Sequence, residues 1–187
     1  MAFEIVWTLL QCLLLVLAAD FFGGLFHWAE DTYGSEDTPL WGRLFVTANK
    51  VHHDRPAEMI KIHWLRNNAI IFIFCGSVVV LVWLAGAMTW QFLLFAIVAA
   101  FNQQAHRFSH TPHQRLPVIV RLLQRARILQ DARHHWGHHR VDSDSHYCVL
   151  TPVLNPVLDR SGFWRGLERM LWPLLGAPRL HHDLPQR

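Results

Sequence analysis

Histidines gather in short clusters along this chain of 187 residues, which has 14 of them. His52 and His53 are adjacent, His106 and His110 are four residues apart, and residues 134–139 read His-His-Trp-Gly-His-His. A spacing of four places two imidazoles on one face of a helix. Imidazole is a common ligand of iron, zinc and copper. The clusters therefore predict a metal site.

The number of imidazoles favours two metal ions over one, because a tetrahedral zinc site needs only four ligands. Carboxylates accompany a further histidine: Asp20 lies about two helical turns before His27, and Asp31 lies four residues after it. Asp20 and Asp31 are candidates for orienting metal-bound imidazoles through hydrogen bonds. Asp20 also interrupts an apolar stretch, where an ionisable residue usually has a functional role.

Long apolar stretches must position these histidines. Hydrophobic residues make up 52% of the chain and charged residues 17%, a balance too apolar for a typical soluble domain. Residues 5–28, 68–86 and 88–108 form apolar runs, and about 20 such residues in a helix cross the hydrocarbon core of a bilayer. We expect one all-α integral membrane domain over residues 1–187, with about three to four transmembrane helices.

The distribution of basic residues predicts the orientation of these spans. None of the 17 lysines and arginines precedes Arg43, and none lies between Arg66 and Arg107. The positive-inside rule then places the N-terminus outside and residues 29–67 and 109–187 in the cytosol. Every histidine falls at or beyond the inner end of a span. We therefore expect a histidine-rich helical cap on the cytosolic face that forms a single shared site.

Two further apolar segments do not have the uninterrupted apolar composition of a transmembrane helix. Residues 116–129 alternate apolar side chains with arginines, a pattern typical of an amphipathic helix in the membrane interface. Residues 149–175 are apolar but contain three prolines, so we expect them to lie in the interface as well.

Five motifs follow one another along the chain: ADFFGGLFHWAEDTYG at 19–34, HHDRP at 52–56, NQQAHRFSH at 102–110, HHWGHH at 134–139 and YCVLT at 147–151, the last followed by Asn155. In this order they resemble the motifs of the plasmanylethanolamine desaturase family, which includes a plant plastid desaturase that acts on palmitate. The resemblance covers about residues 19 to 170.

The resemblance implies a membrane-bound lipid desaturase that uses two iron ions, as a di-iron centre, and O2. Its product would be a double bond in a phospholipid chain, either a vinyl ether made from a plasmanylethanolamine-type ether lipid or an unsaturated fatty acyl chain. Iron is preferred to zinc because hydrogen abstraction from an unactivated methylene needs a redox-active metal. The implied ligands are His27, His52, His53, His106, His110, His134, His138 and His139. His135 is the alternative to His134, because residues 134–139 contain both an HxxxHH and an HxxHH register.

The sequence shows no haem-attachment, flavin or dinucleotide motif. We therefore expect a separate electron donor, such as a ferredoxin or a cytochrome b5-type protein, and no nucleic-acid partner. Two alternatives remain open: a di-iron lipid or carotenoid hydroxylase, and a non-catalytic metal- or haem-binding membrane protein. A zinc protease is disfavoured because no HExxH motif occurs, and a zinc transporter because the spans carry few polar residues.

Overall fold

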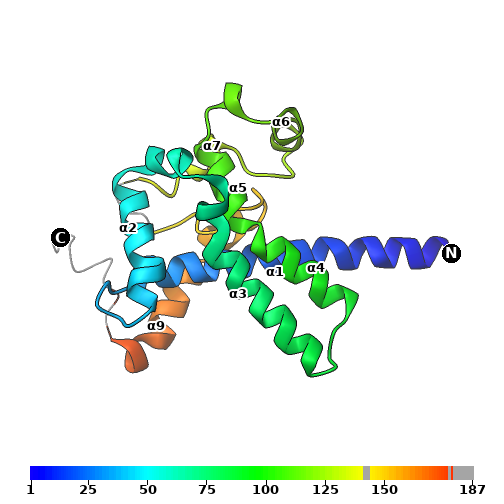
Figure 1. Cartoon of the computed structure of the whole chain (residues 1–187), viewed down its shortest axis with the longest axis horizontal. Helices are drawn as coiled ribbons and strands as arrows, with labels where there is room; N and C mark the ends of the chain where they lie inside the picture. Colours follow the sequence, from blue (N-terminus) through cyan, green and yellow to red (C-terminus); the bar gives the residue numbers. More distant parts are fainter. Residues whose placement is uncertain (141–143, 177, 179–187) are drawn as a thin grey trace.

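Helices make up nearly all of the regular structure in the computed structural model, which describes residues 1–140, 144–176 and 178 (Figure 1). No strand occurs among these residues, so the predicted all-α class is confirmed. In chain order the elements are α1 (Ala2–Tyr33), η1 (Gly42–Val46), α2 (Thr47–Asp54), η2 (Pro56–Lys61), α3 (Trp64–Leu84), α4 (Trp90–Ala100), α5 (Asn102–His110), η3 (His113–Arg115), α6 (Val118–Arg125), α7 (Ala132–His135), α8 (Leu154–Arg160) and α9 (Phe163–Leu175).

Helix α1 joins an apolar stem to a buried, polar inner end. Its 32 residues correspond to about 48 Å of helix, more than the hydrocarbon thickness of a bilayer. Residues 2–10 are exposed, and the N-terminal part of α1 projects beyond the other helices (Figure 1). The inner half buries Asp20, His27 and Thr32. The same helix therefore supplies both an apolar surface and part of the candidate site.

Among the described residues, α1 and α3 are the helices long and apolar enough to cross a membrane. They match the runs predicted at 5–28 and 68–86. Helix α3 begins earlier than expected because His63 caps it: the Leu65 N–H donates to His63 Nδ1 over 3.3 Å. The lone His63 thus has a structural role.

The run predicted as one helix over 88–108 is divided at Phe101 into α4 and α5, which corrects that boundary. Asn102 explains the break, because its side-chain amide donates to the Ala19 carbonyl of α1 at 3.1 Å and to the Ala99 carbonyl at 3.3 Å. These bonds fix the start of α5 against α1. Helices α3 and α4 still form the expected hairpin, with a turn at Gly86 whose φ is 68°.

A core of aromatic side chains lies against the inner half of α1. Trp28, Tyr147 and Trp164 are its fully buried members, and residues of α8 and α9 pack around them. Helix α9 buries Trp164 and Glu168 and exposes Met170 and Trp172. Helix α6 also forms as expected and exposes apolar side chains at 118, 119 and 122.

Candidate metal centre

Two groups of potential metal ligands lie side by side in the described part of the chain. We call them group A and group B. Group A consists of His52, His106, His110, His135 and His139. Group B consists of His27, Asp31, His53 and His138. In each group the ligand atoms all lie within 4.8 Å of one another.

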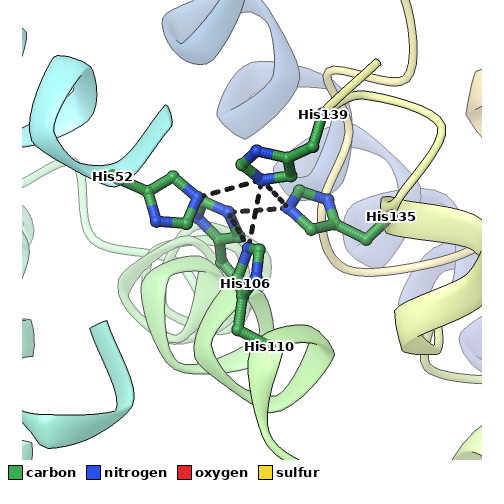
Figure 2. Close-up of side chains that lie close together, drawn as sticks. All are labelled: His52, His106, His110, His135 and His139. Atoms are coloured by element: carbon green, nitrogen blue, oxygen red, sulfur yellow. Dashed lines mark hydrogen bonds between the residues drawn. The ribbon is translucent and has the colours of Figure 1, made fainter. Parts of the chain in front are cut away.

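The five rings of group A turn their Nε2 atoms toward a common centre (Figure 2). His139 Nε2 lies 3.2 Å from His52 Nε2, 3.3 Å from His110 Nε2 and 3.2 Å from His135 Nε2. His106 Nε2 lies 2.9 Å from His135 Nε2. Neighbouring nitrogens bound to one ion at about 2.1 Å are about 3 Å apart. The spacing therefore fits a single ion surrounded by imidazoles.

Group B combines three imidazoles with one carboxylate. His53 Nε2 lies 3.1 Å from Asp31 Oδ1, and His138 Nε2 lies 3.3 Å from Asp31 Oδ2. His27 Nε2 is 3.7 Å from the same Oδ2. His27 Nε2 and Asp31 Oδ2 are buried and have no hydrogen-bond partner among the described residues. Buried polar atoms without partners are costly, and an ion at the centre of group B would satisfy both.

Adjacent histidines serve different groups. His52 belongs to group A and His53 to group B, and His139 and His138 divide in the same way. Successive side chains on a helix point about 100° apart, so a His-His pair on α2 can face two neighbouring centres. The rings of His53 and His139 are 5.1 Å apart between centroids, which brings the two groups into contact.

Backbone carbonyls orient two ligands of group B. His27 Nδ1 lies 3.2 Å from the Tyr147 carbonyl oxygen, and His138 Nδ1 lies 2.8 Å from that of Ser145. A carbonyl oxygen can only accept, so each Nδ1 carries the proton and each Nε2 presents its lone pair to the group. Such contacts fix the tautomer and the orientation of a metal-binding imidazole. The segment around Ser145 and Tyr147, which has no regular secondary structure, is therefore part of the site.

That segment is held by residues that do not touch the histidine groups. Asp20 accepts hydrogen bonds from the backbone N–H groups of Leu150 and Thr151 at 2.8 and 2.9 Å. Asn155 accepts from the N–H of Cys148 and donates to its carbonyl. Asp20 thus supports the site at a distance, through the backbone, rather than by contact with an imidazole. Asn155 is among the residues that carry the resemblance, but no residue spacing in the sequence predicted these contacts.

Asp31 has a closer role than the sequence suggested, because its carboxylate lies within group B rather than behind an imidazole. Asn49 of α2 donates a hydrogen bond to Asp31 Oδ1 and was also missed. Its position four residues before His53 places the two on one face of α2, and this spacing is the signal that could have identified it.

Burial keeps the group A imidazoles neutral. Desolvation, followed by the nearby His138, lowers the pKa of His110 to about 4. Desolvation and the neighbouring His110 lower the pKa of His139 to about 3, and the same causes hold the pKa of His135 well below its usual value. A neutral imidazole has a free lone pair for a metal, so these rings can bind a metal ion without first losing a proton.

The 134–139 run takes the HxxHH register. His135 lies in group A, whereas His134 Nε2 lies 3.2 Å from the side-chain amide of Asn155. Asp131 caps α7 by accepting from the His134 N–H at 2.9 Å, and the turn after α7 brings His139 Nε2 to 3.2 Å from His135 Nε2. His134 lies outside both groups, so the geometry favours the alternative residue.

The remaining described histidines have other surroundings. His146 Nδ1 lies 3.2 Å from Asp159 Oδ2, and His113 is exposed on η3. His134 and His146 line an open cavity of about 1310 Å³ on the outer side of the 134–140 segment. His181 and His182 lie outside the described residues.

The fold and the site together define a helical protein with long apolar helices and a histidine-rich candidate metal centre. Comparison with known proteins then identifies the family: the lipid desaturase domain matches residues 16–181. The chain belongs to this family. No solved structure matches it significantly.

Its relatives are named for desaturation of two lipid classes. The chain is 32% identical over 166 residues to fatty acid desaturase 4-like 2 of Arabidopsis thaliana, covering 86% of this chain and 58% of the relative. It is 30% identical over 185 residues to plasmanylethanolamine desaturase 1 of Mus musculus, covering 90% and 66%. A plasmanylethanolamine desaturase of Myxococcus xanthus is 28% identical over 185 residues, covering 92% and 64%. The chain thus spans about three fifths to two thirds of these three relatives, and their names support a lipid desaturase function.

Proposed function

We propose that this protein is a membrane-bound, iron- and O2-dependent lipid desaturase whose groups A and B each hold one iron ion. The observation that carries the proposal is the division of nine donors into two adjoining groups, to which the long apolar helix α1 contributes His27 and Asp31. Five imidazoles in one group exceed a tetrahedral zinc site. Imidazole with carboxylate suits iron, and bound iron supplies the one-electron and O2 chemistry that hydrogen removal from a methylene requires.

The chain's own residues prepare this site in three ways. The buried group A rings are neutral, so no proton competes with the metal. Asp31 places a negative charge beside three imidazoles and offsets the charge of a cation. The carbonyls of Ser145 and Tyr147 hold two ligands in the metal-binding tautomer.

The proposed substrate is a phospholipid chain, either the alkyl chain of an ether lipid or a fatty acyl chain, because relatives are named for both activities. Desaturation withdraws two electrons and two protons from the lipid. Two further electrons complete the reduction of O2 to water, and we assign them to an external donor of the ferredoxin or cytochrome b5 type. We also propose that the N-terminus lies outside and that both groups face the cytosol, in keeping with the positive-inside rule.

Purified protein and its variants test this function. We expect about two iron ions per chain in the wild type, and joint loss of iron and activity in His138→Ala and His139→Ala, since each removes a ligand from one group. The exposed His113→Ala is the matched control and should keep both.

Mass spectrometry of lipids from a deletion strain and its complemented parent gives the product. Loss of two hydrogens supports a desaturase, whereas gain of one oxygen would indicate a hydroxylase. Full iron and activity in both ligand variants would overturn the assignment of the two groups. A haem absorption band without non-haem iron would favour the non-catalytic alternative.

A further inference from the structure

A chain of four oxidisable aromatic rings leads away from group B. The rings of His138 and Tyr147 are 5.3 Å apart between centroids, and those of Tyr147 and Trp164 are 4.9 Å apart. Trp164 stacks on Trp28 at 6.0 Å, and Trp28 meets Tyr33 edge-on at 5.6 Å. Each ring is thus in contact with the next, from a candidate metal ligand to a half-buried tyrosine.

Packing alone does not explain why these four rings are tyrosines and tryptophans. The sequence has 12 phenylalanines but only two tyrosines, and these two tyrosines stand at the two ends of the tryptophan pair. Phenylalanine would fill similar space in an apolar core, and Phe163 does so beside Trp164. Indole and phenol differ from a benzene ring in that they give up one electron readily.

Both tryptophans have a carboxylate at the indole nitrogen. Trp164 Nε1 donates to Asp159 Oδ1 at 3.2 Å, and Trp28 Nε1 donates to Glu168 Oε1 at 3.4 Å. The two indoles are 2% and 3% exposed, so a charge at the indole nitrogen acts through a medium of low polarity. Glu168 also pairs with Arg165 at 2.6 Å, so Asp159 beside Trp164 is the stronger source of negative charge. A nearby carboxylate stabilises the cation that an indole forms when it loses an electron, and it can accept the indole proton.

We propose that Tyr147, Trp164, Trp28 and Tyr33 form an electron relay that protects the metal centre when O2 has oxidised it and no lipid is bound. This relay rests on the proposed iron and O2 chemistry. It goes beyond desaturation, because its electrons come from a small soluble reductant and return the centre to its resting state without a product.

The electron balance is simple. Trp164 gives one electron to the oxidised centre through the adjoining Tyr147 ring, and a proton from solvent accompanies it. Trp28 then reduces Trp164, and Tyr33 reduces Trp28. A one-electron reductant of the ascorbate or thiol class reduces Tyr33 and is itself oxidised to its radical. Each passage therefore moves one electron inward and oxidises one molecule of the reductant. The full reduction of one O2 to two molecules of water takes four electrons in all, together with four protons from solvent.

The test uses the iron-loaded protein with O2 and ascorbate in the absence of lipid. Freeze-quenched wild-type samples should show an organic radical in electron paramagnetic resonance, with a line shape that changes when the protein contains ring-deuterated tryptophan. Trp164→Phe should lose this tryptophan signal and inactivate after several-fold fewer O2-consuming cycles. Its iron content and its desaturation rate with saturating lipid should stay at wild-type values.

Three variants separate the relay from packing. Trp164→Tyr restores an oxidisable ring and should recover part of the lost resistance. Trp28→Phe, one ring further from the histidines, should shorten survival even if Trp164→Phe impairs folding. Trp172→Phe, an exposed tryptophan on α9, should behave as wild type.

A Trp164→Phe protein with a normal tryptophan radical and normal survival would overturn the relay and leave the proposed function intact. A wild-type protein that contains no iron, or that consumes no O2, would overturn the proposed function and the relay with it.

Discussion

His134 and His135 are neighbours in the chain but differ in what surrounds them. His135 is almost fully buried among the group A rings, whereas His134 faces Asn155 and an open cavity. Helical spacing alone does not separate them, because His134 also has a histidine four residues later. The turn that follows the end of α7 at His135 decides it, since it brings His139 Nε2 to 3.2 Å from His135 Nε2. The sequence could state the two registers but could not choose between them.

This pair gives a direct test of the register. His135→Ala should lower activity by at least about 100-fold, more than the loss of an outer-shell partner typically causes, and should lower metal content. His134→Ala should keep wild-type metal content and most of the activity. The test measures the metal content and the lipid turnover of the two purified variants. The reverse pattern would show that the HxxxHH register is used.

Asp31 offers a second test at the scale of one side chain. Asp31→Asn keeps the size of the group but removes the charge that faces three imidazoles. We expect metal content to fall from about two ions per chain to about one, because group B loses its only anionic ligand. The exposed Asp37→Asn should have no effect. Two firmly bound ions in Asp31→Asn would remove the carboxylate from the ligand set.

At the scale of elements, the site depends on how closely α1 approaches the segment 145–151. That segment supplies the carbonyls that orient His27 and His138, and Asp20 ties it to α1. Gly24 makes the approach possible, since a Cβ there would lie 2.6 Å from Cys148 Sγ and 3.0 Å from the Cys148 backbone nitrogen.

Gly24→Ala should therefore destabilise the protein by about 1–3 kcal/mol, the usual cost of forcing an extra group into a packed interior. Metal retention should weaken as well, because the carbonyls of the segment would shift. Gly76→Ala is the matched control: it lies on α3, and a Cβ there meets nothing within 4 Å. Thermal unfolding and metal release in detergent measure both effects. Equal stability of the two variants would contradict the close-contact argument.

At the scale of the whole molecule, the long apolar helix α1 contributes His27 and Asp31 to group B, and shorter elements contribute the other ligands. Among the described residues, two helices, α1 and α3, are long and apolar enough to cross a membrane, and the division at Phe101 leaves α4 and α5 as separate shorter helices. The orientation across the membrane stays a prediction from the distribution of basic residues.

Cysteine labelling tests that orientation. In a background without Cys12 and Cys75, Ala87→Cys at the exposed hairpin tip should react with a membrane-impermeant maleimide in intact cells. Ala57→Cys, exposed on η2, should react only after the membrane is permeabilised. Labelling of Ala57→Cys in intact cells, with protection of Ala87→Cys, would reverse the predicted topology.

Residue types and their local spacing determined the apolar helices and most of the ligand clusters of this protein. Apolar runs predict α1 and α3 because a helix satisfies its own backbone in a membrane. The histidine spacings mark the clusters at 52–53, 106/110 and 134–139, whereas the family resemblance implied His27 and gave His135 only as the alternative to His134. The apolar runs and the spacings are local signals: they depend on residue type and on helical period, both of which can be read along the chain.

The tertiary structure decided which metal-binding side chains belong to group A and which belong to group B. The phase of α2 assigns His52 to group A and His53 to group B, and the fold of the segment 145–151 provides the carbonyls that fix His27 and His138. His27 and Tyr147 are 120 positions apart, so no local pattern encodes their contact. The roles of Asp31 within group B and of Asp20 behind it follow from the same long-range packing.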